Sequence, residues 1–302
     1  MDTQIIIALC EGPHDVAFLN KTLKTVGFKS NEKTSLEEYP FPMNSLLIQE
    51  ATKSDVEALN IQTVRQSLLP SNALKRGDIY IFLYIIGGDS KSDLRKQFIE
   101  KLVSFIRKPG EIRKGRIDDN VSLGVVYFFD ADDKGVVVRI AEVKKEINEV
   151  IDEIPDESFT ANSSIVLKEG LKIGSYIFSG NDNNTGKLED ILLPIMIENN
   201  EDIFNSANEF LEKHYDEDRL FPMKIEWTEN EVITEKRSTK AGDKFKYNKS
   251  KSLIGTVGQL QHSGGANTVC IGFTDYLRLE KIQANPKCQE IISFVEKFIA
   301  FE

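Results

Sequence analysis

The chain has 302 residues, 40% of them hydrophobic and 28% charged, which is the composition of an ordinary globular protein with one large or two moderate domains. Its net charge of -10 argues against a protein that coats nucleic acid without specificity, although a local basic groove stays compatible with it. The three cysteines argue against a disulfide framework, and the longest wholly apolar run, Ile79–Ile86, is too short to span a bilayer, so we expect a cytoplasmic protein with no membrane partner.

The chain opens with a buried strand and a helix. Residues 4–10 form a continuous apolar run, which indicates a strand that is buried on both faces. Apolar side chains then recur with helical spacing over residues 14–26, which predicts a helix. Residues 28–77 break this alternation and include a polar stretch of helical character near 54–69. We interpret 28–77 as an insertion or lid.

Strand and helix patterns then alternate along the chain. Each apolar run that predicts a strand is followed by Gly or Asp and then by an amphipathic stretch that predicts a helix. Strands are expected at 79–86, 123–129 and 175–179, and helices at 92–107, 137–154 and 188–197. This alternation predicts an α/β fold in which helices cover both faces of a parallel sheet.

The last third of the chain has a different character. A helix of mixed polarity is expected near 203–214, and two or three further helices follow residue 252. Between them lies a polar stretch with many lysines, for which we expect a mobile basic loop over 236–251. We therefore divide the chain into an α/β domain over 1–196 and a mainly helical C-terminal extension over 197–302.

Acidic residues stand directly after two of the predicted buried strands. Glu11 follows the first strand, and Asp130 and Asp132 follow the strand at 123–129. Open parallel sheets place their ligand sites beyond the carboxyl ends of the strands. Carboxylates that meet there repel one another unless they share a proton or a cation. Magnesium or manganese, which take oxygen ligands, are therefore the expected cofactors.

Three further acids are candidates for the same site. Asp15 begins the helix that follows Glu11, and Glu189 and Asp190 begin the helix predicted at 188–197. One interpretation makes them additional metal ligands, with Glu189 and Asp190 supporting a second ion. The other interpretation, which stays open, is that they interact with the dipoles of the helices that they begin.

Basic residues gather in one segment of an otherwise acidic chain. The candidates for contact with a nucleic-acid backbone are Lys236, Arg237, Lys240, Lys244 and Lys246. Lys249 or Lys251 would stabilise negative charge that develops near the reacting phosphate. A solvated loop without a ligand is the alternative interpretation of this segment.

Several common sites are excluded by spacing. The sequence after Asp130 fails as an EF-hand because Lys134 stands at a ligand position, and the segment 180–187 fails as a P-loop because its spacing is too long. No nucleophile elbow accompanies the three histidines, and no Cys-x-x-Cys or His-Glu-x-x-His framework for zinc is present.

The order of these motifs resembles the Toprim superfamily. Glu11-Gly12-Pro13-His14-Asp15 after the first strand and Asp130-Ala131-Asp132 after a later strand match its two acidic motifs, and Gly87-Gly88 matches the turn between them. Leu188-Glu189-Asp190 is similar to a motif of small stand-alone Toprim proteins and of nucleases related to the overcoming-lysogenization-defect proteins. The resemblance covers residues 1–196, with the insertion inside it.

This resemblance carries expectations of fold and activity. Family membership implies a compact Toprim fold that binds magnesium or manganese, with Glu11 as general acid/base or metal ligand and with Asp130 and Asp132 as ligands. A zinc-binding primase module, a winged-helix topoisomerase half and an amino-terminal ATPase are not recognisable in the sequence. What remains is a stand-alone nuclease-like protein, for which a separately encoded ATPase partner and a homo-oligomer stay open.

The leading hypothesis is therefore a metal-dependent phosphodiesterase that cleaves nucleic acid, with defence against foreign DNA or RNA as one role. Two alternatives stay open. The first is a non-catalytic Toprim module that binds nucleic acid or a partner protein, which the net charge of -10 favours slightly. The second is a phosphatase of the haloacid-dehalogenase type, in which the first Asp of Asp-x-Asp attacks phosphate.

Overall fold

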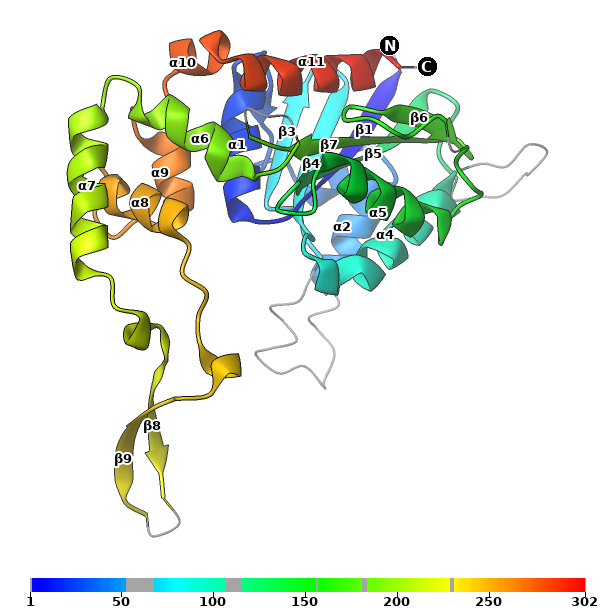
Figure 1. Ribbon diagram of the computed structural model, residues 1–302. Helices are drawn as coiled ribbons and strands as arrows, with labels where there is room; N and C mark the ends of the chain where they lie inside the picture. The colour runs from blue at the N-terminus through cyan, green and yellow to red at the C-terminus, as the bar shows by residue number, and fades with distance from the viewer. Residues whose placement is uncertain are drawn as a thin grey trace.

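A seven-stranded sheet forms the centre of the protein (Figure 1). The computed structural model describes residues 2–52, 68–106, 116–155, 157–180, 184–228 and 231–301. The strands are β1 (Thr3–Cys10), β2 (Lys29–Ser30), β3 (Asn72–Arg76), β4 (Ile79–Ile85), β5 (Val121–Asp130), β6 (Ile165–Lys168), β7 (Leu171–Phe178), β8 (Met223–Trp227) and β9 (Ile233–Arg237). The α-helices are α1 (Pro13–Lys24), α2 (Met43–Thr52), α4 (Ser92–Phe105), α5 (Val136–Asn148), α6 (Leu188–Ile197), α7 (Glu201–His214), α8 (Lys249–Gly258), α9 (Asn267–Phe273), α10 (Leu279–Ala284) and α11 (Pro286–Ala300).

The order of strands in the main sheet is β2-β3-β4-β1-β5-β7-β6. The four central strands, β4, β1, β5 and β7, run parallel, and the outer strands β3 and β6 pair antiparallel to their neighbours. Three of the central strands, β1, β4 and β5, have largely apolar sequences, because both of their faces are covered. The predicted α/β fold with a largely parallel sheet is confirmed.

Two hydrophobic cores lie on opposite faces of the sheet. On one face, α1, α6 and α11 pack on the strands together with α8 and α9 from the C-terminal region. On the other face, α2, α4 and α5 form the second core. Alternate side chains of β1 serve the two cores, since Ile6 and Ala8 belong to the first and Ile5 and Ile7 to the second. Both cores meet the strand ends that carry the acidic motifs.

The C-terminal extension shares the core of the sheet. Phe298 of α11 lies over two glycines, and an added Cβ would lie 2.7 Å from its ring at Gly124 of β5 and 2.9 Å from it at Gly174 of β7. Glycine at both positions therefore lets an aromatic ring approach the backbone of the sheet. The extension expected over 197–302 is mainly helical, and its last helix completes one side of the core.

Two predicted segments have more regular structure than the sequence indicated. Within the expected insertion at 28–77, β2, α2 and β3 belong to the sheet and its second core, while residues 53–67 lie outside the described residues. The basic loop expected over 236–251 is also partly regular, because β9 runs to Arg237 and α8 begins at Lys249. We call residues 221–248, which contain the β8–β9 hairpin, the arm; it projects away from the sheet (Figure 1).

Among the described residues, no helix is both long enough and apolar enough to cross a lipid bilayer.

Candidate functional site

The pairing of β1 with β5 brings the two acidic motifs to one edge of the sheet. Cys10 is the register partner of Phe128, so Glu11 and Asp130 leave neighbouring strands close together. Glu11 Oε1 accepts a hydrogen bond of 3.3 Å from the backbone N–H of Asp130. Side chains that are far apart in sequence therefore meet beyond the carboxyl ends of the strands, where parallel sheets place their ligands.

The Gly87-Gly88 turn after β4 presses against this edge. A Cβ added at Gly87 would lie 1.7 Å from the Cα atom of Glu11, so only glycine fits there without displacing the acid. The N–H of Ile86 donates a hydrogen bond of 3.1 Å to the carbonyl of Cys10. The turn thus fixes the backbone that presents Glu11.

Asp15 faces the site from the first turn of α1. Its side chain is only 4% exposed, and its Oδ2 accepts a hydrogen bond of 2.7 Å from the N–H of Gly12. Burial, followed by the charges of Glu11 and Glu189, raises the pKa of Asp15 to about 7, and the hydrogen bond from Gly12 opposes that rise. Asp15 therefore both caps its helix and belongs to the acidic site, so the two interpretations of this residue describe the same geometry.

Asp130 is held from the opposite side. Its Oδ1 accepts a hydrogen bond of 2.8 Å from the N–H of Leu188, the first residue of α6. Burial, together with the charges of Asp15 and Glu11, raises the pKa of Asp130 well above its ordinary value despite that hydrogen bond. In the absence of a cation, the cluster retains protons that isolated carboxylates would release.

Glu189 joins the cluster from α6. Its side chain is 2% exposed, and its Oε1 lies 2.9 Å from Nδ1 of His14 and 3.7 Å from Nζ of Lys251. Burial would raise the pKa of Glu189, but the hydrogen bond with His14 and the charge of Lys251 lower it below its ordinary value. Glu189 is therefore an ionised carboxylate beside acids that resist ionisation.

Asp132 turns toward α5. Its backbone has a φ of 47°, in the left-handed region that Asp tolerates better than most residues. Its Oδ2 lies 3.0 Å from Nη2 of Arg139, and the same Nη2 lies 3.9 Å from Glu11 Oε1. Arg139 also donates from Nε to the carbonyl of Asp130 at 3.0 Å. A guanidinium therefore links the two acidic motifs.

The other predicted site residues lie in different places. Asp190 Oδ2 accepts a hydrogen bond of 2.9 Å from the N–H of Lys187, so it caps α6. Lys249 pairs with Glu212 of α7 at 2.5 Å, whereas Lys251 reaches Glu189. The remaining basic candidates are on the arm: Lys236, Arg237, Lys240, Lys244 and Lys246.

The cluster has the donors for a hard divalent cation. Glu11, Asp15, Asp130 and Glu189 offer carboxylate oxygens, which magnesium and manganese prefer, and burial and the charges of the neighbouring acids raise the pKa of Asp15 and Asp130. In the ranges that the structure describes, no group of three His, Cys, Asp or Glu side chains is arranged to hold a metal ion as it stands. The chemistry of the donors fits the ion, and the side chains would have to close around it.

Comparison with known proteins places the chain in a family. It matches, over residues 6–299, the family described as "Protein of unknown function (DUF3226)". The chain belongs to the DUF3226 family. Among solved structures, the hypothetical protein PH0156 from Pyrococcus horikoshii OT3 is similar at 15% identity and a TM-score of 0.48, over 98% of this chain and 95% of that one. No curated protein matches the chain in sequence.

Sequence reasoning missed two residues of the site in this DUF3226 protein. His14 stands inside the first acidic motif but was not among the candidate site residues, although its Nδ1 contacts the buried Glu189. Arg139 was not a candidate, although a signal was present: it shares the buried side of α5 with Val136, Ile140 and Val143. An arginine on an apolar helix face needs a partner for its charge, and here the partners are the acids at the strand ends.

Proposed function

We propose that this DUF3226 protein is a Toprim-type phosphodiesterase that depends on magnesium or manganese and cleaves nucleic acid. The observation that carries this proposal is that Glu11 contacts the backbone of Asp130 at the carboxyl ends of neighbouring parallel strands, where burial and the nearby charges of Asp15 and Glu189 raise the pKa of Asp130. An acidic cluster of this kind has no packing role that apolar residues would not serve better, because buried carboxyl groups lose their hydration. Clustered groups of raised pKa are typical of functional sites.

The proposed ion would be held by the acids of the two strand-end motifs. Glu11 and Asp130 are the first candidate ligands. Asp132 could join them if its ion pair with Arg139 opens, and Asp15 and Glu189 are further candidates. A divalent ion in such a site polarises a phosphoryl oxygen and lowers the pKa of a bound water. The other roles belong to side chains of the chain itself.

Two basic side chains support this chemistry from the C-terminal region and α1. Lys251, on the first turn of α8, is half-exposed and lies 3.7 Å from Glu189. From there its ammonium group can stabilise negative charge that develops on a phosphate. His14 holds Glu189 in place through the 2.9 Å contact. Lys249, two residues before Lys251, forms an ion pair with Glu212 instead. Lys251 is therefore the stronger candidate for charge stabilisation.

The arm is the proposed contact for the nucleic-acid chain. It presents Lys236, Lys240 and Lys246 together with Trp227 and Phe245, whose exposed fractions are 71% and 67%. Lysines neutralise phosphates, and exposed aromatic rings stack on unpaired bases. The arm leads through Asn248 into α8, whose first turn carries Lys251 to the acids. One surface thus continues from the arm to the site.

A cleavage assay tests the proposal. Plasmid, single-stranded DNA and RNA are incubated with the protein and magnesium or manganese, and Glu11→Gln and Asp130→Asn are expected to reduce cleavage by at least about 100-fold, since each removes a ligand charge. Asp133→Asn is the matched control, because Asp133 is an exposed neighbour of the motif and should leave the rate unchanged. Cleavage that survives both site substitutions contradicts the proposal.

A second candidate is a non-catalytic module that binds nucleic acid or a partner, such as a separately encoded ATPase. The separation of the acids favours it, because no three of the described side chains form a ready metal site. This candidate predicts binding to the arm with no turnover under either metal ion. The same assay, read beside a binding titration, distinguishes it from the enzyme.

A further inference from the structure

Arg139 occupies the space between the acids that the proposed ion would bind. The side chain is buried, and it makes three contacts with the strand-end motifs. Nη2 lies 3.0 Å from Asp132 Oδ2 and 3.9 Å from Glu11 Oε1, and Nε donates to the carbonyl of Asp130 at 3.0 Å. One guanidinium therefore supplies the positive charge that a bridging cation would supply.

A divalent ion and this guanidinium compete for the same oxygens. A carboxylate oxygen cannot use the same lone pair both for a hydrogen bond from Arg139 and for a bond to a metal ion. In addition, the charges of the guanidinium and the metal ion repel each other in a partly buried site. In the structure, the guanidinium already engages Oδ2 of Asp132 at 3.0 Å. Metal binding by both motifs requires the guanidinium to move.

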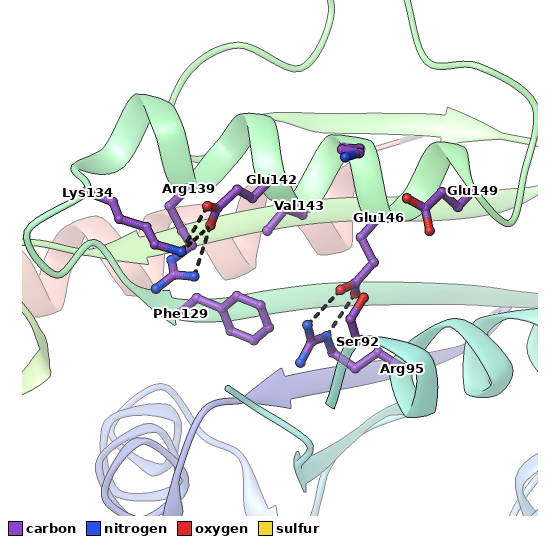
Figure 2. A pocket seen from close by; sticks show the side chains of 10 residues that line it. Ser92, Arg95, Phe129, Lys134, Arg139, Glu142, Val143, Glu146 and Glu149 are labelled. Carbon is purple, nitrogen blue, oxygen red and sulfur yellow. Dashed lines mark hydrogen bonds and ion pairs between the residues drawn. The ribbon is translucent and has the colours of Figure 1, made fainter. Parts of the chain in front are cut away.

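The structure offers the displaced guanidinium a second acceptor. Glu142, one turn along α5, already lies 3.1 Å from Nη1 of Arg139 (Figure 2). Both residues line a cleft of about 290 Å³ between α4 and α5, which leaves room for the side chain to swing outward. Lys134 also binds Glu142, at 2.9 Å, so the two cations share that carboxylate. In a single conformation the guanidinium of Arg139 thus contacts Asp132 and Glu11 through Nη2, its inner side, and Glu142 through Nη1, its outer side.

We infer that Arg139 is an internal counter-cation, which a divalent ion displaces from Glu11 and Asp132 toward Glu142. The inference rests on the proposed function, since it concerns the same metal. It assigns Arg139 a positioning role: the residue keeps the acids together while no ion is bound, and it sets how tightly an ion binds. It also gives Glu142 a role, because the displaced guanidinium depends on that carboxylate.

The test is binding of manganese to the full-length protein, followed through the electron paramagnetic resonance signal of the free ion. Arg139→Gln removes the competitor and should tighten binding by about tenfold or more, whereas Glu142→Gln removes the outer acceptor and should weaken it. Lys145→Gln is the matched control: it removes one positive charge from the same helix and cleft, away from the acids, and should leave the affinity unchanged.

The outcomes separate this inference from the proposed function. If the wild-type protein binds manganese but Arg139→Gln binds it no more tightly, the counter-cation role is wrong and the metal site stands. If neither the wild type nor any variant binds manganese, both the proposed metal site and the counter-cation role are wrong, because the acids bind no ion even without Arg139. Should Arg139→Gln fail to fold, which thermal unfolding shows, Glu142→Gln still decides: unchanged or tighter binding overturns the inference.

Discussion

Asp15 shows how the fold sets the charge of the acidic site. Its carboxyl group has lost water, and it lies beside Glu11 and Glu189, so ionisation costs more in the folded chain than in the unfolded chain. The hydrogen bond from the N–H of Gly12 stabilises the ionised form and offsets only part of this cost. The pKa of Asp15 therefore lies near neutral pH, and this makes the site sensitive to pH before any ligand is considered.

The pH dependence of stability follows from this pKa. The folded chain holds the proton of Asp15 up to about pH 7, whereas the unfolded chain releases it near 3.8, so the free energy of unfolding falls as pH rises through that window. Asp15→Asn keeps an acceptor for Gly12 but cannot ionise. Relative to the wild type, it should gain stability between pH 4 and pH 8, by on the order of 4 kcal/mol at most.

Urea unfolding of both proteins at several pH values, without divalent ions, measures this difference. Subtracting the two curves removes the contributions of acids that Asp15 does not influence, whereas the part of the pKa shift of Asp130 that the charge of Asp15 causes stays in the difference. A difference between wild type and variant that stays constant from pH 4 to pH 8 would show that Asp15 ionises normally.

The packing of α11 on the sheet is a property of whole elements that local sequence does not reveal. The ring of Phe298 occupies the space that a side chain at position 174 of β7 would need, so glycine fits there. A methyl group added there would lie 2.9 Å from the ring, so Gly174→Ala should destabilise the protein by about 1–3 kcal/mol. In a Phe298→Leu background the same change should cost less, because the nearer of two rings has been removed while Phe294, at 3.1 Å, remains.

A double-mutant cycle in urea measures the coupling between the two positions. Gly272→Ala is the control, since a Cβ at that helical position in α9 meets nothing within 4 Å and should cost no stability. Costs at Gly174 and Phe298 that simply add would mean that α11 does not lie on β7 as described.

The sequence predicted the central elements because their patterns are strong. The buried strands β1, β4 and β5 have continuous apolar runs, and the helices that follow them have apolar stripes. The short antiparallel strands β3 and β6 were missed, since four or five residues at a sheet edge, such as Ile165–Lys168, carry no clear period. The β8–β9 hairpin was missed because its side chains are exposed on both faces.

The site was partly predictable for a topological reason. Acids at strand ends are visible in sequence, and parallel pairing of the strands necessarily brings Glu11 and Asp130 together. The partners of those acids were harder to predict. Arg139 lies on α5 only seven residues after Asp132, and its place on the apolar side of that helix was a signal that could have been used. Lys251 reaches Glu189 only because α8 packs beside α6, and the docking of two distant helices leaves no local signature.

Basic residues are unevenly distributed along the chain. The chain as a whole carries a net charge of -10, but residues 236–251 hold seven basic residues and a single acidic one. Most of this excess projects away from the sheet (Figure 1), where the repulsion from the acidic body is weakest. A polyanion approaching the protein would therefore meet the arm before the site, and the proposed function assigns the arm to substrate capture.

Removal of the arm tests this division of roles. The rings of Tyr215 and Tyr247 stack with centroids 4.4 Å apart, so the two ends of the arm lie side by side, and residues 217–245 can be replaced by a short Gly-Ser linker. Because the described residues of the arm contribute nothing to the two cores, we expect the free energy of unfolding to stay within about 0.5 kcal/mol of the wild type. Nucleic-acid affinity should fall by at least about tenfold, and its salt dependence should flatten.

Fluorescence anisotropy with labelled single strands at two salt concentrations measures the affinity, and urea unfolding measures the stability. Glu226→Gln and Glu235→Gln within the intact hairpin serve as controls, because they keep every basic residue and should not weaken binding. Manganese binding by the shortened protein should be unchanged, since the acids lie on the sheet and on α1 and α6. An arm deletion that binds nucleic acid as tightly as the wild type would place the binding surface on the body, and the basic segment would then be no more than a solvated extension.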